Sequence, residues 1–197
     1  VAEVIIPLTQ HVGAPCEPTV KVGDEVKIGT VIGDVEASLY APVHSSVSGV
    51  VKKIEKRYTL DGSSATCVTI ENNFKDEFVF QESDKKIEDF STEEIIEAVK
   101  KAGVIGMGGA AFPAHNKLSG ALKGIDSIIL NGAECEPYLT CDHRMMLEWG
   151  DKIIDGLKII MKVTNATNGY IGIEDNKKDA IESLESKLSS MANLHVA

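Results

Sequence analysis

Four glycines stand within seven positions of the chain, at Gly103, Gly106, Gly108 and Gly109. Glycine loses more backbone freedom on folding than any other residue, so a loop this rich in glycine usually serves a close backbone approach. Backbone N–H groups that converge without side chains around them bind phosphate groups or lie against flat rings. A turn that only packs two helices together is the alternative. The spacing matches neither GxGxxG nor the Walker loop, so it does not identify a nucleotide site by itself.

Acidic and amide side chains follow two short apolar segments in the second half of the chain. Asn131, Glu134 and Glu136 end or follow DSIILN at residues 126–131, and Glu174 and Asn176 end or follow GYIGIED at residues 169–175. If both segments are strands of a parallel sheet, a ligand is expected outside their carboxyl ends.

The cysteines predict neither a disulfide scaffold nor a metal site. Cys16, Cys67, Cys135 and Cys141 are few and scattered, and no CxxC pair is present. Cys135 and Cys141 could be combined with His143, but their spacing matches no common metal site, and two reduced thiols beside functional residues are the simpler interpretation. No Ser/His/Asp or Cys/His arrangement indicates hydrolytic chemistry, so no catalytic residue is assigned.

Alternating helices and strands must position the residues of the second half. Ser91 or Thr92 can cap a helix that ends at Gly103, and Pro113 suits the first turn of a helix running to about residue 122. The remaining pattern predicts strands at residues 126–131 and 169–175 and helices at 141–149, 151–163 and 177–188. Such alternation is typical of an α/β layer with a parallel sheet.

The first 90 residues consist instead of short β segments separated by turns. Apolar and polar residues alternate at 19–22 and 47–54, as half-buried strands require. Many short strands with no room for helices predict a small β-sandwich or barrel. We therefore expect an all-β domain over residues 1–90 and an α/β domain over residues 91–197, joined between about residues 72 and 92.

The segment VKVGDEVKIGTVIGDVEASLYAPVHSSVSGVVKKI, at residues 20–54, resembles the barrel-sandwich hybrid of biotinyl and lipoyl carrier domains. Those domains attach their prosthetic group to a lysine at a hairpin tip. The corresponding stretch from Val35 to Val43 contains no lysine. A swinging-arm carrier is therefore disfavoured, and we predict a docking or scaffolding domain without a covalent lipoyl or biotinyl group.

Three linked motifs extend the resemblance over essentially the whole chain. They are GMGGAAFP at residues 106–113 with Lys117, NGAECEPYLTCDHRMMLE at 131–148, and YIGIEDNK at 170–177. These motifs are similar to those of the flavin- and NADH-binding subunit of respiratory complex I. Together with the opening IPLTQHVGAPCEP they resemble most closely the RnfC family, the NADH- and FMN-binding subunits of the Rnf ion-translocating electron transport complexes. The resemblance implies a barrel-sandwich hybrid β domain followed by a truncated, Rossmann-like α/β FMN-binding domain.

The resemblance implies FMN and NAD(H) as cofactors and implies that the glycine loop binds FMN. Gly106, Gly108 and Gly109 would lie against the FMN phosphate and ribityl chain. Lys117 would be a charged partner, and Phe112 could stack on a ring.

The resemblance also gives roles to the residues near the strand ends. Asn131 and Glu134 would contact the flavin, and Glu136 would lie near the nicotinamide nucleotide. Tyr170, Glu174 and Asn176 would complete the pocket wall. Each role has a simpler rival, since Glu134 and Glu136 could cap the following helix and Tyr170 could be ordinary sheet core.

Two departures weaken a direct transfer of the nucleotide contacts. Ile105 and Met107 stand where the complex I loop has arginines, and Ala133 stands where it has an acidic residue. The family also carries two [4Fe-4S] clusters on CxxCxxCxxxCP motifs, which these 197 residues do not contain. We therefore expect the chain to be part of a longer polypeptide and inactive as an isolated fragment.

Composition excludes several partners. The formal net charge is −10 and 43% of residues are apolar, so we expect neither a nucleic acid nor an anionic membrane surface as a ligand. Neither an apolar run of about 20 residues nor a signal peptide is visible. We expect a peripheral protein on the cytoplasmic side of the cell membrane, without direct membrane insertion.

The sequence therefore predicts part of an oxidoreductase that exchanges hydride between NAD(H) and FMN. Electrons would pass to iron–sulfur clusters outside these residues, as in ferredoxin:NAD⁺ oxidoreductase coupled to ion transport. Other Rnf subunits, and ferredoxin through them, would be its partners. The alternatives are a similar electron carrier of a soluble reductase, such as proline reductase, and a docking or assembly module without a cofactor.

Overall fold

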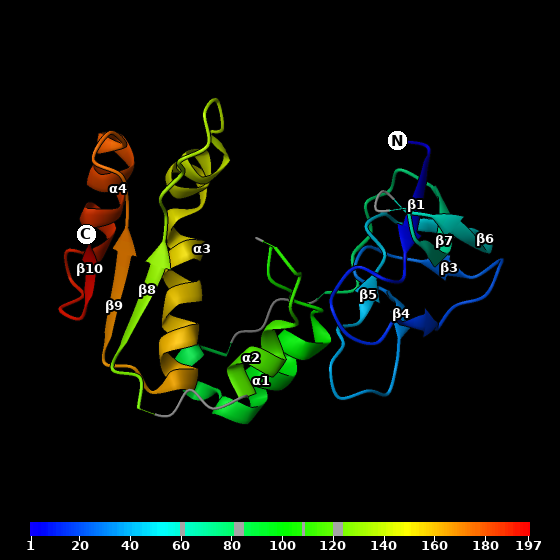
Figure 1. Cartoon of the computed structure of the whole chain (residues 1–197), viewed down its shortest axis with the longest axis horizontal. Helices are drawn as coiled ribbons and strands as arrows, with labels where there is room; N and C mark the ends of the chain where they lie inside the picture. Colours follow the sequence, from blue (N-terminus) through cyan, green and yellow to red (C-terminus); the bar gives the residue numbers. More distant parts are fainter. Residues whose placement is uncertain (60–61, 81–84, 108, 120–123) are drawn as a thin grey trace. The chain divides into compact units, whose positions relative to one another are not determined.

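The computed structural model describes residues 1–59, 62–80, 85–107, 109–119 and 124–197. The chain forms two compact units, Val1–Gly120 (unit 1) and Ala121–Ala197 (unit 2). Their elements are labelled in Figure 1. Each unit contains its own cluster of buried apolar side chains.

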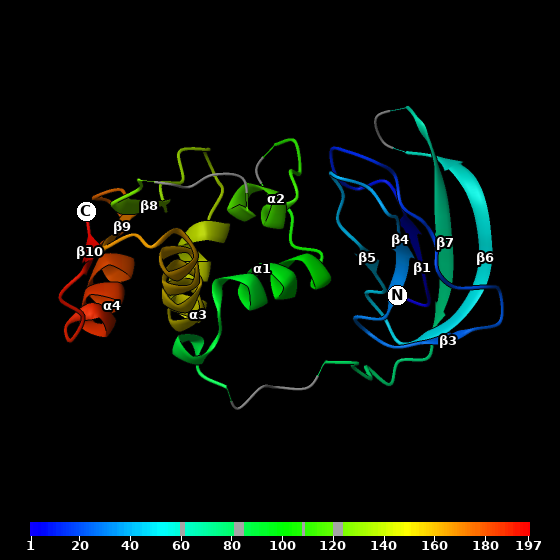
Figure 2. The same ribbon diagram turned by 90° about the horizontal axis from the view of Figure 1, so that it is seen from below.

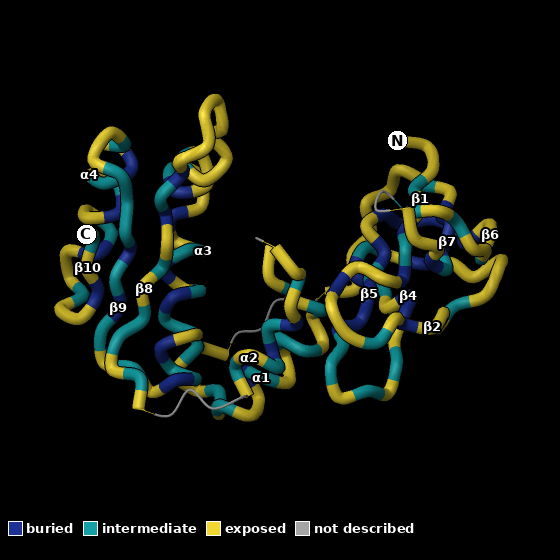
Figure 3. Tube along the Cα trace, in the orientation of Figure 1, coloured by how far each residue is buried: buried dark blue, intermediate teal, exposed yellow. Residues whose placement is uncertain are grey.

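Unit 1 begins with two antiparallel β-sheets. The larger has the strand order β1-β7-β6-β3 and the smaller the order β2-β4-β5. The strands of the larger sheet are β1 (Glu3–Pro7), β3 (Glu25–Val26), β6 (Gly49–Tyr58) and β7 (Ser64–Asn72), and those of the smaller are β2 (Glu17–Pro18), β4 (Val31–Asp34) and β5 (Val43–His44). Side chains of both sheets share one core, which includes the fully buried Ile32, Val51 and Ile70. Figure 3 shows this buried interior in dark blue.

The strand predicted at residues 19–22 is wrong. This segment lies before β3 and forms a turn, in which Lys21 N donates to Asp24 Oδ2 at 2.8 Å and Asp24 N donates to the Lys21 carbonyl at 3.1 Å. Gly23 adopts a φ of 97°. An aspartate that bonds to nearby backbone groups in this way favours a turn over a strand, and this local chemistry overrides the alternating pattern.

Two helices and a short 3-10 helix follow the sheets among the described residues of unit 1. The 3-10 helix η1 (Ile87–Asp89) precedes α1 (Thr92–Lys101) and α2 (Ala114–Ser119). The predicted cap is confirmed, because Ser91 Oγ accepts from Glu94 N while Glu94 Oε2 accepts from Ser91 N. The predicted end of the second helix, near residue 122, lies outside the described residues.

The compact units divide later along the chain than the boundary predicted near residue 90. Hydrogen bonds and ring contacts join α1 and α2 to the β-sheets, for example from Asn116 Nδ2 to the Ser38 carbonyl at 2.8 Å. These contacts explain why both helices fall in unit 1. That residues 91–197 form one functional domain stays a prediction.

The described residues of unit 2 form a three-stranded parallel sheet with two helices. The strands β8 (Ser127–Asn131), β9 (Asn168–Gly172) and β10 (Leu194–Val196) have the order β10-β9-β8, and the helices are α3 (Cys141–Thr164) and α4 (Lys178–Leu188). Figure 2 shows α3 and α4 on the same face of the sheet. Leu157, Ile171 and Leu184 are fully buried between them. The predicted strands β8 and β9 are confirmed, whereas β10 was not predicted.

Helix α3 covers both helices predicted at 141–149 and 151–163. Trp149, with φ −125° and ψ 26°, interrupts the helical geometry at the predicted junction. Within the described part of the chain, no helix combines the length and apolarity that crossing a membrane requires.

Candidate functional site

The glycine loop of unit 1 closes on itself between α1 and α2. Ile105 and Pro113 form an antiparallel bridge, and Gly106 N donates to the Phe112 carbonyl at 2.8 Å. Gly109, near the middle of the loop, has a φ of 127°, and the space that a Cβ there would enter is open. Gly108 lies outside the described residues. Gly109 therefore has a backbone that few other residues adopt, with room beside it for a ligand.

Two side chains expected near the cofactor flank this loop. Phe112 is 37% exposed, and Lys117, on α2, is exposed. Gly106, Gly109, Phe112 and Lys117 thus lie on one short segment of unit 1, between residues 106 and 117. An accessible ring, a cation and a bare backbone are groups that can bind a phosphorylated aromatic ligand.

The other expected residues lie in unit 2, near the carboxyl ends of β8 and β9. Asn131 and Gly172 are register partners on these adjacent strands, and Gly132 N donates to the Gly172 carbonyl at 2.8 Å. The prediction that the two polar segments follow neighbouring parallel strands is therefore confirmed. The expected site residues that end or follow these two strands are Asn131, Glu134, Glu136, Glu174 and Asn176.

Glu134 caps the N-terminus of α3. Its side chain is 8% exposed, and its carboxylate accepts from Asp142 N at 2.8 Å, Cys141 Sγ at 3.2 Å and His143 N at 3.3 Å. The bond from Asp142 N is the main reason why the pKa of Glu134 lies below its ordinary value. Thr140, at the N-cap position, makes no side-chain capping bond. The capping role considered for Glu134 is confirmed, and its contact with a flavin stays a prediction.

The remaining polar residues of this edge are more accessible. Asn131 Oδ1 accepts from Ala133 N at 3.1 Å, which shapes the turn after β8. Glu136 and Asn176 are exposed, and Glu174 is half-buried. Glu136 makes no side-chain cap to α3 in the contacts of the described residues; its carbonyl accepts from Leu139 N.

Tyr170 lies on the sheet face opposite the helices. Its neighbours Gly169 and Ile171 are buried, and side chains alternate across a strand. The Tyr170 ring stacks on His195 of β10 with centroids 5.2 Å apart. Tyr170 is half-buried, so it is not ordinary sheet core in unit 2.

Two interactions near Glu134 were not predicted from the sequence. His143 Nε2 lies 2.8 Å from Asp179 Oδ1, which links the first turn of α3 to α4. This bond is the main reason why the pKa of Asp179 lies below its ordinary value. The hydrogen bond to Glu134 is likewise the main cause that raises the pKa of the Cys141 thiol. These partners are up to 36 residues apart, so spacing along the chain carried no signal for them.

The structure does not bring Cys135, Cys141 and His143 together as a possible set of metal ligands. Among the described residues, Glu134, Cys141 and Asp142 offer ligand atoms within 4.8 Å of one another. The Glu134 carboxylate is bonded there to backbone N–H groups and to the thiol. Helix capping accounts for this cluster.

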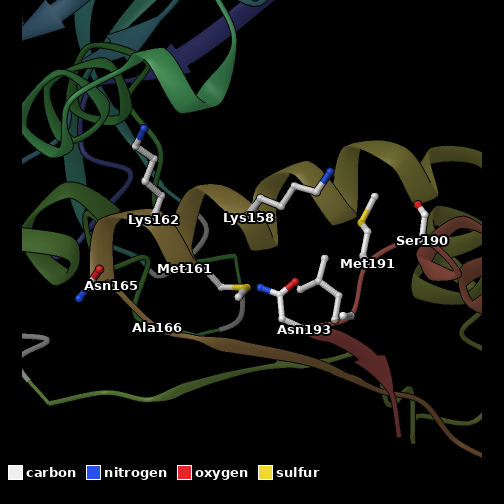
Figure 4. A pocket seen from close by; sticks show the side chains of 10 residues that line it. Lys158, Met161, Lys162, Asn165, Ala166, Ser190, Met191 and Asn193 are labelled. Carbon is white, nitrogen blue, oxygen red and sulfur yellow. The ribbon is translucent and has the colours of Figure 1, made fainter.

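Two pockets of unit 2 differ in their relation to these residues. The larger, about 530 Å³, lies between the end of α3 and the segment before β10 and contains none of the predicted site residues. Figure 4 shows Met161, Met191 and Asn193 lining it. A pocket of about 310 Å³ includes Asn131 and Gly132 and is otherwise lined mainly by apolar side chains of β8 and α3. The second pocket is therefore the one adjacent to the strand-end residues.

Comparison with known proteins matches each half of the chain to a family model. The model of the RnfC barrel sandwich hybrid domain matches residues 1–75, and the model of the Nuo51 FMN-binding domain matches residues 99–197. These matches leave the predicted boundary near residue 90 between them.

Curated relatives match nearly the whole chain. The C subunit of the Na⁺-translocating ferredoxin:NAD⁺ oxidoreductase complex of Acetobacterium woodii is 43% identical over 197 residues, which cover 98% of this chain and 44% of that protein. The C subunit of the proton-translocating ferredoxin:NAD⁺ oxidoreductase complex of Clostridium ljungdahlii is 43% identical over 185 residues, covering 93% and 40%. The C subunit of the ion-translocating oxidoreductase complex of Serratia proteamaculans is 38% identical, covering 92% and 26%.

The chain thus spans less than half the length of these three relatives. The two family models match this chain one after the other and together account for most of its residues. The chain therefore belongs to the family of the Nuo51 FMN-binding domain over residues 99–197, and with its preceding RnfC barrel sandwich hybrid domain it corresponds to the N-terminal region of RnfC proteins.

Proposed function

We propose that this chain is the flavin-binding part of a subunit that exchanges hydride between NAD(H) and FMN. Electrons would then pass to [4Fe-4S] clusters held by residues outside the chain. The observation that carries the proposal is the cluster of polar residues after β8 and β9, within the region that matches the FMN-binding domain model. Ligands of α/β folds bind outside the carboxyl ends of parallel strands. A Rossmann-like completion of this sheet is part of the proposal.

The glycine loop fits a phosphorylated flavin. A ligand can approach Gly109 closely because its Cβ position is open and its φ of 127° suits glycine. The N–H of Gly106 already donates to the Phe112 carbonyl, so this N–H is not free for the phosphate. Gly106 instead lets the ligand approach because it has no side chain. We propose that Gly106, Gly108 and Gly109 lie against the phosphate and ribityl chain.

The charged and aromatic residues of this segment have matching roles. Lys117 is exposed and would balance the charge of the phosphate, which is worth about 1 kcal/mol for a solvated pair. Phe112 is partly accessible and would cover a ring face.

The residues of unit 2 would orient the flavin and the nicotinamide nucleotide. FMN supplies the hydride and one-electron chemistry, while the protein binds it and adjusts its electrostatic surroundings. Asn131 offers an amide at the sheet edge, and Glu134 keeps the β8 turn joined to α3 as an ionised carboxylate. Glu136 would contact the nicotinamide nucleotide, and Tyr170, Glu174 and Asn176 would form the wall of the pocket.

The relatives, which are named as members of oxidoreductase complexes, support a wider proposal. We propose that the full-length protein is an NADH-dependent oxidoreductase subunit, peripheral on the cytoplasmic side of the membrane. It would contact other Rnf subunits and exchange electrons with ferredoxin through them. The chain alone would be inactive, because it contains no route for electrons beyond the flavin.

The experiment is an anaerobic reduction of the full-length natural protein. Bound flavin is first released and identified by mass, and NADH is then added while the flavin absorbance is followed. We expect FMN in equimolar amount and bleaching by NADH. A folded protein without flavin would favour the docking module instead. FMN that NADH does not reduce would favour an electron carrier of a soluble reductase.

A further inference from the structure

Both ends of the glycine loop are bonded to one hairpin of the β domain. Asn116 Nδ2, on α2, donates to the Ser38 carbonyl at 2.8 Å. His44 Nε2 donates to the carbonyl of Lys101, the last residue of α1, at 2.9 Å. Ser38 and His44 both belong to residues 31–44, the β4–β5 hairpin. The loop therefore starts and ends at points fixed to the same hairpin.

Close packing accompanies these two bonds. Gly103 has a φ of 64°, and a Cβ at this position would collide with the Pro42 carbonyl oxygen. The Tyr40 ring meets the buried His115 ring edge to face, with centroids 6.2 Å apart. Lys100 Nζ lies 5.3 Å from the centroid of the Tyr40 ring. The hairpin tip is thus in contact with residues on both sides of the loop.

The hairpin tip is also bonded to the segment after β1. Ala41 N donates to His11 Nε2 at 3.1 Å, and Ala14 N donates to the Leu39 carbonyl at 2.9 Å. The Cys16 thiol donates to the Ala41 carbonyl at 3.2 Å. Glu36 and Ser38 at the tip are exposed, whereas Ala41, which follows them and makes two of these bonds, is 1% exposed. The tip is therefore a fixed support.

The loop between the two anchors has little other support. Its neck is closed by the bond from Gly106 N to the Phe112 carbonyl and by the bond from Ala114 N to the Val104 carbonyl at 2.9 Å. Among the described residues, no atom outside its immediate neighbours lies within 4 Å of the Cβ position of Gly109. Glycine backbones have many conformations available, so fixed ends restrict those that the loop samples.

We propose that the β4–β5 hairpin positions the glycine loop, with Asn116 and His44 as positioning residues that set its shape before the cofactor binds. The inference rests on the proposed function in one respect, that FMN is the ligand of the loop. A preformed loop loses less conformational entropy on binding, which increases affinity. The hairpin that carries a lysine in carrier domains has here become a support for a binding loop.

The test compares four variants of the full-length natural protein. Asn116→Leu and His44→Phe remove one donor each, and His44→Gln retains an N–H donor. Asn72→Leu is the control away from the loop, because Asn72 Nδ2 donates to the Val1 carbonyl at 3.0 Å and Asn72 Oδ1 accepts from Phe74 N at 2.8 Å, so this variant loses at least as many bonds. Hydrogen–deuterium exchange of peptides over residues 103–116 is measured without flavin, and the FMN Kd is measured by fluorescence quenching.

We expect loop exchange about threefold to tenfold faster in Asn116→Leu and His44→Phe, the effect of losing one hydrogen bond. The FMN Kd should rise by a similar factor, while His44→Gln and Asn72→Leu stay near the wild type. The melting temperature of Asn116→Leu should change little, because Asn116 Oδ1 is buried without a partner among the described residues. A merely structural bond would change the melting temperature without changing the FMN Kd.

Unchanged loop exchange in folded Asn116→Leu and His44→Phe would overturn the inference, whatever FMN does. The wild-type protein could also prove to bind no FMN, while both variants still exchange faster in the loop. That result would support the role of the hairpin and refute the proposed function. If one variant fails to fold, the other decides the outcome, since the two donors act at opposite ends of the loop.

Discussion

At the scale of single residues, Glu134 has a structural role that is independent of any ligand. Its carboxylate bonds to the first N–H groups of α3, where an anion also interacts favourably with the helix dipole. Because its pKa in the folded protein is lowered, the stabilisation is present above the ordinary glutamate pKa of 4.5 and is lost as pH falls through the folded value.

Glu134→Gln should therefore lower the melting temperature at neutral pH by a few degrees, because the amide replaces a charged acceptor. The difference from the wild type should shrink as pH falls below about 4.5. Thermal melts from acid to neutral pH measure this. The control is Glu136→Gln, two residues later on an exposed side chain. A difference that is constant with pH would contradict the capping role.

The sequence could predict which residues of unit 2 approach one edge, but not how each side chain is used. Asn131 and Glu174 followed from the strand pattern, since polar residues after apolar strands mark this edge. Whether Glu134 faces a ligand or a helix end depends on the path of residues 135–140, which no periodicity describes. The pairing of His143 with Asp179 depends on how α3 packs on α4.

At the scale of elements, strong local signals were the ones that predicted the structure. The capping residue predicted at Ser91 or Thr92 placed the start of α1, and the helical patterns at 141–149 and 151–163 placed α3. The segment at 19–22 and the strand β10 were not predicted correctly. A backbone turn around Asp24 overrides alternation, and β10 exists because it pairs with β9, a contact with residues far away in sequence.

A packing prediction belongs to this scale. Gly169, on β9, lies against the core, where a Cβ would be 2.6 Å from Leu194 Cδ2 and 2.7 Å from Met161 Sδ. Gly169→Ala should therefore destabilise unit 2 by about 1–3 kcal/mol. Urea unfolding measures the change.

Gly156→Ala is the matched control, because this residue lies in α3 with nothing within 4 Å of the Cβ position. Alanine is the better helix former, so this variant should be about as stable as the wild type or more stable by about 0.5–1 kcal/mol. A Gly169→Ala protein as stable as the wild type would contradict the close packing around β9.

At the scale of the whole molecule, the two cores consist of different residues. The composition and the change of pattern near residue 90 predicted two domains. They could not predict that α1 and α2 would join the β-sheets, because the bonds of Asn116 and His44 involve backbone carbonyls, which any residue type provides.

Separate cores predict separate unfolding transitions. Ile70→Ala in unit 1 and Leu157→Ala in unit 2 remove fully buried side chains, and each should cost about 2–5 kcal/mol. We expect each variant to shift one transition in calorimetry and leave the other in place. A single transition that both variants shift equally would contradict independent units.

The central claim is that the glycine loop binds FMN, and its most direct test is FMN titration of Gly109→Val against Gly62→Val. Both glycines have positive φ, at 127° and 79°, and both have open space at the Cβ position. Valine strains either backbone by about 1–3 kcal/mol, so both variants carry a similar penalty.

We predict that Gly109→Val raises the FMN Kd in the full-length natural protein by about tenfold or more, equivalent to about 1.4 kcal/mol. Gly62→Val, in the turn between β6 and β7, should bind FMN like the wild type at a similar melting temperature. Equal FMN affinity in a folded Gly109→Val protein and in the wild type would contradict the claim.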